Sequence, residues 1–156
     1  MKATSLLTGW TCRHLGDTAP GKPVTLPHDA MLAEPRTALS AGGTNTGWYE
    51  GYDYEYRRTL TVPENELADT HILEFEGVYH NAEVWLNGQK AAFRPYGYTN
   101  FYVDCAPYLH AGENDLRVIA RNADQPNSRW YSGAGIYRPV QLWTARGAHI
   151  ALNGVK

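Results

Sequence analysis

The chain has 156 residues, which fits one globular domain large enough to bury a substantial core. Hydrophobic residues make up 43% and charged residues 19%, and the net charge of −2 offers no basic surface to nucleic acid or an anionic membrane. No apolar run is long enough for a signal peptide or a membrane span. We therefore expect a cytoplasmic protein that binds neither nucleic acid nor a membrane.

Alternation of apolar and polar residues predicts a series of short β-strands. In chain order, we expect strands at 5–12, 24–26, 54–62, 72–75, 82–86, 101–105, 116–120, 140–144 and 149–152. Only 64–69 and 106–110 are candidates for a helical turn, and both are short. Regularly spaced strands with Gly- and Pro-rich turns are typical of a β-sandwich or barrel. We therefore expect residues 1–156 to form a single all-β domain.

Two local features refine this prediction. Asn87-Gly88 lies between two alternating runs and predicts a tight hairpin, because both residues tolerate a positive φ. Arg58 interrupts the apolar face of the strand at 54–62, so we expect its side chain at the edge of that face.

Pairs of carboxyl groups are of interest because a glycosidase uses two of them, about 5–9.5 Å apart. Glu74 and Glu76 share one face of a predicted strand, but alternating acids are typical of a solvated face. Glu50 and Asp53 flank an aromatic loop, which raises their interest without making a catalytic pair. We assign no catalytic residue in this chain.

Other chemistry-bearing residues also give negative results. Cys12 and Cys105 are far apart in the sequence, which favours free buried thiols and leaves a disulfide open. The six histidines lack metal-ligand spacing, so neither a metal nor another cofactor is expected. His28-Asp29 lacks a nucleophile motif and is expected to hold a loop by hydrogen bonds. Gly133-Ala134-Gly135 lacks the Lys and the strand–helix context of a phosphate loop.

Aromatic residues concentrate in three loops, at 47–52, 94–100 and 125–139. The last combines Arg129 and Trp130 with further polar residues, and planar donors beside aromatic rings suit the hydroxyls and C–H faces of sugars. In the alternative, Trp130 fills the end of the sandwich and Arg129 pairs internally with a carboxylate. The residue types alone leave both interpretations open.

Six ordered blocks carry a resemblance to a known family. They are LPHDA (26–30), YEYRRTLTVP (54–63), LEFEGVYHNAEVWLNG (73–88), RPYGYTNFYVD (94–104), GEN (112–114) and QPNSRWYSGAGIYRPVQLW (125–143). From about Trp10 to its end, the chain resembles the N-terminal sugar-binding domain of family 2 glycoside hydrolases, which include β-galactosidases, β-glucuronidases and β-mannosidases. The run SRWYSGAGIYR is most similar to bacterial β-galactosidases.

This resemblance implies a jelly-roll β-sandwich of about eight or nine antiparallel strands. It also implies an immunoglobulin-like sandwich and a (β/α)8 barrel after residue 156, the barrel carrying both catalytic glutamates of a retaining exo-glycosidase. The chain would then be a fragment without activity of its own, and its partners would be a β-galactoside-type carbohydrate and the missing domains. Whether it forms a homo-oligomer stays open.

The resemblance further implies that two loops contribute to the rim of the sugar pocket. The residues carried over as substrate-binding are Tyr49, Gly51, Tyr52, Asn127, Ser128, Arg129 and Trp130. Arg129 is expected to face substrate and Trp130 to pack, with residues 127–131 more exposed than their composition suggests. Some relatives hold a metal with an acidic residue near Ser128, but a serine is a poor substitute, so no metal site is expected. The alternatives are an autonomous lectin-like module and a purely structural scaffold.

Overall fold

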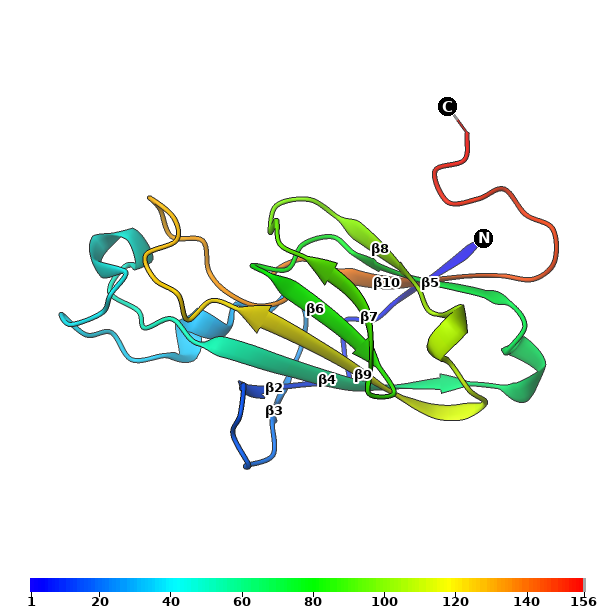
Figure 1. Cartoon of the computed structure of the whole chain (residues 1–156), viewed down its shortest axis with the longest axis horizontal. Coiled ribbons are helices and arrows are strands. Elements are labelled where there is room, and N and C mark those ends of the chain that lie inside the picture. Colours follow the sequence, from blue (N-terminus) through cyan, green and yellow to red (C-terminus); the bar gives the residue numbers. More distant parts are fainter. Residues whose placement is uncertain (156) are drawn as a thin grey trace.

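The structure is a computed structural model that describes residues 1–155, and it consists of two antiparallel sheets packed face to face (Figure 1). One sheet has four strands in the order β1 (Lys2–Ser5), β10 (Val140–Ala145), β5 (Thr70–Phe75) and β8 (Phe101–Asp104). The other has six strands in the order β3 (Lys22–Val24), β2 (Trp10–His14), β4 (Asp53–Val62), β9 (Gly112–Arg121), β6 (Ala82–Leu86) and β7 (Gln89–Arg94). The predicted jelly-roll β-sandwich is confirmed, with ten strands in place of eight or nine.

The core lies between the sheets, where the inward-facing residues of each strand meet. Tyr54, Tyr56, Leu60 and Val62 of β4 are all buried, as their alternation predicts. β4 pairs with β9 from Asp53↔Arg121 to Val62↔Gly112, so these two long strands form the centre of the larger sheet. Burying each large apolar side chain contributes about 1.5–3 kcal/mol, and this repeated burial is what holds the two layers together.

The hairpin between β6 and β7 turns at Asn87-Gly88 as predicted. Both residues have positive φ, 49° at Asn87 and 78° at Gly88, and nothing crowds Gly88. The Asn87 amide also donates to the backbone oxygen of Tyr108 at 2.8 Å, which ties this turn to η4 (Ala106–Tyr108). The two helical turns predicted from the sequence are both short 3-10 helices, η4 and η3 (Glu64–Glu66).

Three predictions about elements were wrong. The single strand expected at 5–12 is split into β1 and β2, because the chain leaves one sheet and joins the other through Gly9, whose φ is 80°. Residues 149–152 form no strand and have no β-partner among the described residues. Helical turns are not limited to 64–69 and 106–110, because the segment at 28–52 contains two further 3-10 helices, η1 (Ala30–Ala33) and η2 (Gly43–Thr46), which are too short for their periodicity to show in the sequence.

Two glutamates are buried at positions where the alternation of apolar and polar residues predicts a solvent-exposed side chain. Alternation in β4 puts Glu55 on the polar outer face, opposite Tyr54 and Tyr56, yet Glu55 is only 2% exposed because Arg13, Arg57 and Arg117 close over its carboxylate. Hydrogen bonds from these arginines hold the pKa of Glu55 below its usual value, against the effect of its burial. Glu74 is likewise buried, and it accepts a hydrogen bond from the Trp143 indole at 2.7 Å, so it is not a solvated acid.

Arg58 lies on the inner face of the six-stranded sheet, beside Trp10. Its guanidinium is 6.0 Å from the centroid of the Trp10 ring, and its Nε and Nη1 are buried without a hydrogen-bond partner among the described residues. Burial lowers the pKa of Arg58 because no carboxylate offsets the loss of hydration.

The two cysteines are buried and unpaired, as favoured from the sequence. Burial raises the pKa of the Cys12 thiol to about 11 and that of Cys105 to about 12, so both are protonated and unreactive near neutral pH. No helix within residues 1–155 is long and apolar enough to cross a membrane.

Candidate functional site

The loops at 28–52 and 122–139 meet at one end of the sandwich, opposite the chain termini (Figure 1). Asp53, the first residue of β4, fixes where the second loop begins. Its carboxylate accepts hydrogen bonds from the backbone N–H groups of Asn122 and Ala123 at 3.0 and 3.1 Å, and pairs with Arg121 at 3.0 Å. Asp53, one of the carboxyl candidates, is thus occupied in holding the loop.

Asp29 joins the two loops directly. One carboxylate oxygen caps η1 by accepting from the Met31 N–H at 3.1 Å and also accepts from the Ala134 N–H at 3.0 Å. The other oxygen accepts from the Tyr131 hydroxyl at 2.6 Å. Burial and the neighbouring Asp29 carboxylate both raise the pKa of Tyr131, so its hydroxyl stays a donor. A Cβ on Gly133 would lie 2.6 Å from Asp29, so this contact requires a glycine.

His28 and Gly135 extend the same junction into the core. His28 Nδ1 lies 2.8 Å from the buried Tyr56 hydroxyl, and burial lowers the pKa of the imidazole. Gly135 has a φ of 99°, and a Cβ there would overlap the Tyr56 hydroxyl and lie 2.8 Å from its Cζ. His28 and Asp29 therefore hold the loop by hydrogen bonds, as expected, and the Gly133–Gly135 segment packs closely against Asp29 and Tyr56.

Asn127 points into its own loop. Its amide donates to Asn122 Oδ1 at 2.8 Å and to the backbone oxygen of Asp124 at 2.9 Å, while its oxygen accepts from the Tyr79 hydroxyl at 3.1 Å. Both ends of this side chain are used internally, so Asn127 shapes the loop. Ser128 behaves similarly, since its hydroxyl donates to the backbone oxygen of Trp130.

The first predicted loop is packed against the second. A Cβ on Gly51 would lie 2.6 Å from Gln125 and would also meet the Asn122 carbonyl, so Gly51 permits this close approach. The Tyr49 ring is half-buried, with its centroid 6.0 Å from that of Tyr131. Tyr49 and Gly51 of the first loop therefore lie against residues of the second loop.

Arg129 and Trp130 face outward from the loop at 122–139, and we call residues 129–131 the loop tip. Arg129 is exposed and has no hydrogen bond or ion pair with any other described residue. Trp130 is 60% exposed, and its indole N–H donates to the Tyr98 hydroxyl at 3.1 Å. The expectation that Trp130 packs was wrong, because Ala134 and Ile136 already fill the core at this end. Residues 129–131 are exposed as expected, whereas 127 and 128 are half-buried.

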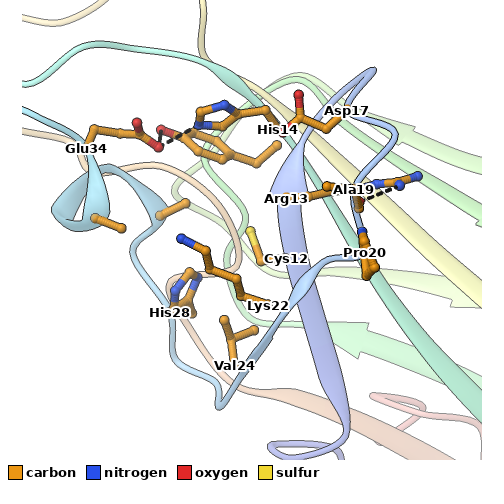
Figure 2. A pocket seen from close by; sticks show the side chains of 13 residues that line it. Cys12, Arg13, His14, Asp17, Ala19, Pro20, Lys22, Val24, His28 and Glu34 are labelled. Atoms are coloured by element: carbon orange, nitrogen blue, oxygen red, sulfur yellow. Dashed lines mark hydrogen bonds and ion pairs between the residues drawn. The ribbon is translucent and has the colours of Figure 1, made fainter.

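A groove of about 210 Å³ lies beside this end, between the β2–β3 hairpin and η1 (Figure 2). His14 Nε2 is 2.7 Å from the Glu34 carboxylate, to which the Tyr54 hydroxyl also donates at 3.4 Å. None of the predicted site residues lines this groove, although Tyr52 stacks on His14 with ring centroids 4.3 Å apart. Its polar residues come from separate segments, so no local motif in the sequence pointed to it.

Tyr98 is the residue at the tip that the sequence did not select. It comes from the aromatic loop at 94–100, which stood out by composition but had no assigned part. No three His, Cys, Asp or Glu residues within 1–155 are arranged to hold a metal ion. The loop tip presents planar donors and aromatic rings, groups that can contact the hydroxyls and C–H faces of a polyhydroxylated ligand.

Comparison with known proteins places the chain in a family. Residues 10–146 match the model of the glycosyl hydrolase 2 galactose-binding domain-like family. A β-galactosidase of Bacteroides ovatus is 40% identical over 90% of this chain and 18% of its own length. A putative β-glucuronidase of Formosa agariphila is 35% identical over 85% of this chain and 13% of its length.

Solved structures agree with this match. A β-glycosidase from Bacteroides vulgatus superposes with a TM-score of 0.84 and 32% identity, over 92% of this chain and 20% of that one. The chain belongs to the galactose-binding-like domain family of the family 2 glycoside hydrolases, in which it corresponds to the N-terminal domain. It spans about a fifth or less of the length of these relatives.

Proposed function

We propose that this chain is the N-terminal accessory domain of a retaining exo-β-galactosidase, and that its loop tip contributes to the rim of the sugar pocket. The observation that carries the proposal is Arg129, an exposed guanidinium without a partner among the described residues, followed in the chain by the exposed Trp130 and Tyr131. An arginine presents five N–H donors in a fixed plane, which suits the hydroxyls of a sugar. The match to a β-galactosidase over most of the chain supports the substrate class.

The seven predicted residues have distinct parts in this proposal. Arg129 donates to sugar hydroxyls, while the rings of Tyr49, Tyr52 and Trp130 contact C–H faces. Gly51, Asn127 and Ser128 act as positioning residues, because their contacts shape the two loops. The two carboxyl groups that break the O-glycosidic bond belong to a barrel beyond residue 156, which follows an immunoglobulin-like domain. The isolated chain is then inactive, and we place the enzyme in the cytoplasm.

The test is Arg129→Ala in the full-length enzyme, with kcat/KM for a β-galactoside as the readout. We expect a loss of about 10-fold or more, which corresponds to about 1.4 kcal/mol of transition-state binding. Arg146→Ala is the control, because Arg146 is also exposed but lies after β10 at the other end of the sandwich, where it pairs with Asp69. An unchanged kcat/KM for Arg129→Ala would favour the purely structural scaffold.

The lectin-like alternative has a separate test. An autonomous module binds galactosides without other domains, so calorimetry on the isolated chain at millimolar sugar would detect it. We expect no measurable affinity, since a surface that forms one wall of a pocket lacks most of the contacts.

A β-glucuronidase is the second candidate. An unpaired guanidinium such as that of Arg129 is also suited to pair with the carboxylate of a glucuronide. The Formosa agariphila relative carries the name of that activity. Comparing kcat/KM for galactoside and glucuronide substrates with the same leaving group decides between the two.

A further inference from the structure

The two exposed aromatic residues that follow Arg129 in the chain turn in different directions. Tyr131 turns toward Asp29 and Tyr49, while Trp130 turns the other way, toward the loop at 94–100. There it meets Tyr98, and Tyr96 lies beside Tyr98 with ring centroids 5.7 Å apart. We name Tyr96, Tyr98 and Trp130 the aromatic corner.

The aromatic corner is exposed to an unusual degree. Trp130 and Tyr96 are 60% and 56% exposed, although aromatic rings gain more from burial than most side chains. Neighbouring exposed rings of this kind mark an interaction site more often than isolated ones do.

The corner is also held in place before any ligand arrives. The Tyr137 hydroxyl donates to the Gly97 carbonyl at 2.6 Å, and a Cβ on Gly97 would lie 2.6 Å from the buried Tyr79 ring. Tyr79 in turn donates to Asn127, so one residue supports both loops. A ligand meeting this surface would lose little free energy to ordering the protein.

The geometry of the rings favours a small cyclic ligand over a broad protein surface. Tyr98 meets Tyr96 at 62° and Tyr79 at 61°, so the rings form a step instead of a flat patch. The Trp130 N–H is already paired with Tyr98, and the ring is nevertheless 60% exposed. The negative face of an aromatic ring attracts the weakly positive C–H groups of a pyranose. The exposed Arg138 beside the corner supplies donors for hydroxyls.

We propose that the aromatic corner binds the second saccharide ring of an oligosaccharide substrate, the one on the leaving-group side of the scissile bond. The proposal rests on the proposed function, because it assumes that Arg129 faces the sugar pocket. The new element is that this domain contributes to selecting the leaving group to which the terminal sugar is attached. Tyr96 and Tyr98, which had no part in the predicted site, become specificity-determining residues.

The test compares two substrates of the full-length enzyme that share the terminal sugar. One is methyl β-galactopyranoside, whose leaving group is too small to reach a second site, and the other is lactose, a β-galactosyl disaccharide. Tyr96→Ala is expected to lower kcat/KM for the disaccharide about 5- to 10-fold and to leave that for the methyl galactoside within 2-fold, because Tyr96 is an exposed ring of the corner with no part in binding the terminal sugar. Tyr98→Phe, which keeps the ring and removes only the hydroxyl partner of Trp130, is expected to show a smaller loss on the disaccharide alone.

Phe93→Ala is the control, because Phe93 is an equally exposed ring on β7, outside the corner. Equal losses on both substrates, with a lower Tm, would overturn the proposal and indicate that a neighbouring domain packs on the corner. Unchanged rates on both would also overturn it.

A second measurement keeps the proposal separate from the proposed function. If the wild-type enzyme hydrolyses neither galactoside, the proposed function fails. The fluorescence of Trp130 then still shows whether the aromatic corner binds a saccharide. A spectral change with disaccharide, greater than with galactose and lost in Trp130→Phe, would support a saccharide platform. No change with either sugar would overturn it.

Discussion

Gly135→Ala tests the junction on which the loop tip rests. Gly135 has a φ of 99°, where an alanine costs about 1–2 kcal/mol of backbone strain. A Cβ there would also overlap the Tyr56 hydroxyl, and forcing a methyl group into a filled core costs about 1–3 kcal/mol. Displacing Tyr56 further weakens its hydrogen bond with His28, which is worth about 1 kcal/mol. We expect a total loss of about 3–6 kcal/mol.

The assay is thermal unfolding followed by circular dichroism. For a chain of this size each kcal/mol corresponds to about 2–4 °C, so Gly135→Ala should lower Tm by about 6–24 °C. Gly88→Ala isolates the backbone term, because Gly88 has a φ of 78° with no atom near a Cβ, and should cost about 2–8 °C. If Gly135→Ala lowers Tm no more than Gly88→Ala does, the inference that Tyr56 leaves no room for a Cβ at Gly135 is refuted.

Three further predictions concern charged groups. Glu55→Gln leaves three arginines around a neutral amide and should lower the free energy of unfolding, measured in urea, by about 2–3 kcal/mol. This is less than the loss for a fully buried pair, because the arginines are partly exposed. The control Asp115→Asn, at an exposed residue, should change it by no more than about 0.5 kcal/mol, and similar values for both variants would contradict the buried cluster. Burial lowers the pKa of His28 and His80, so the unfolded chain takes up protons first as the pH falls through about 6.5. Stability should therefore be greater at pH 7.5 than at pH 5.5, and a higher urea midpoint at pH 5.5 would refute this sign. Arg58→Met removes buried N–H groups without partners and should leave stability unchanged or raise it by about 1 kcal/mol, whereas a loss above about 2 kcal/mol would show that Arg58 has a stabilising partner.

The strands could be predicted because their signal is local. In β4, the alternation of Tyr54, Tyr56, Leu60 and Val62 is enough to place the inner face, since side chains change sides at every residue. The hairpin at Asn87-Gly88 was equally local, because two adjacent residues set its φ values. The split between β1 and β2 was missed because a change of sheet leaves no mark on alternation.

The environment of Glu55 could not be predicted, because it depends on three strands that meet only in the folded chain. Arg13 and Arg117 reach Glu55 from β2 and β9, on either side of β4. Alternation correctly gives the face of the sheet, but burial on that face is set by side chains distant in sequence. The same reason explains why the groove beside η1 was not foreseen.

The candidate site was predictable as a surface and less so residue by residue. The family resemblance indicated that Arg129 is exposed, where the residue types alone had left this open, and the structure agrees with the resemblance. The same reasoning put Trp130 inside, because it could not tell that Ala134 and Ile136 fill that space. Tyr98 escaped attention because its importance lies in a contact with a residue 32 positions away.

Both ends of the chain leave the sandwich on the side away from the loop tip. Lys2 pairs with Thr144 near the far end of β10, and Figure 1 shows the two termini at the end opposite the loops. The six residues of β10 alone measure about 20 Å at 3.3 Å each. A polypeptide that continues beyond residue 156 therefore starts on the side of the sandwich away from the loop that carries Arg129. A domain that packs on this loop would have to be joined through a linker or an intervening domain that reaches past the length of β10.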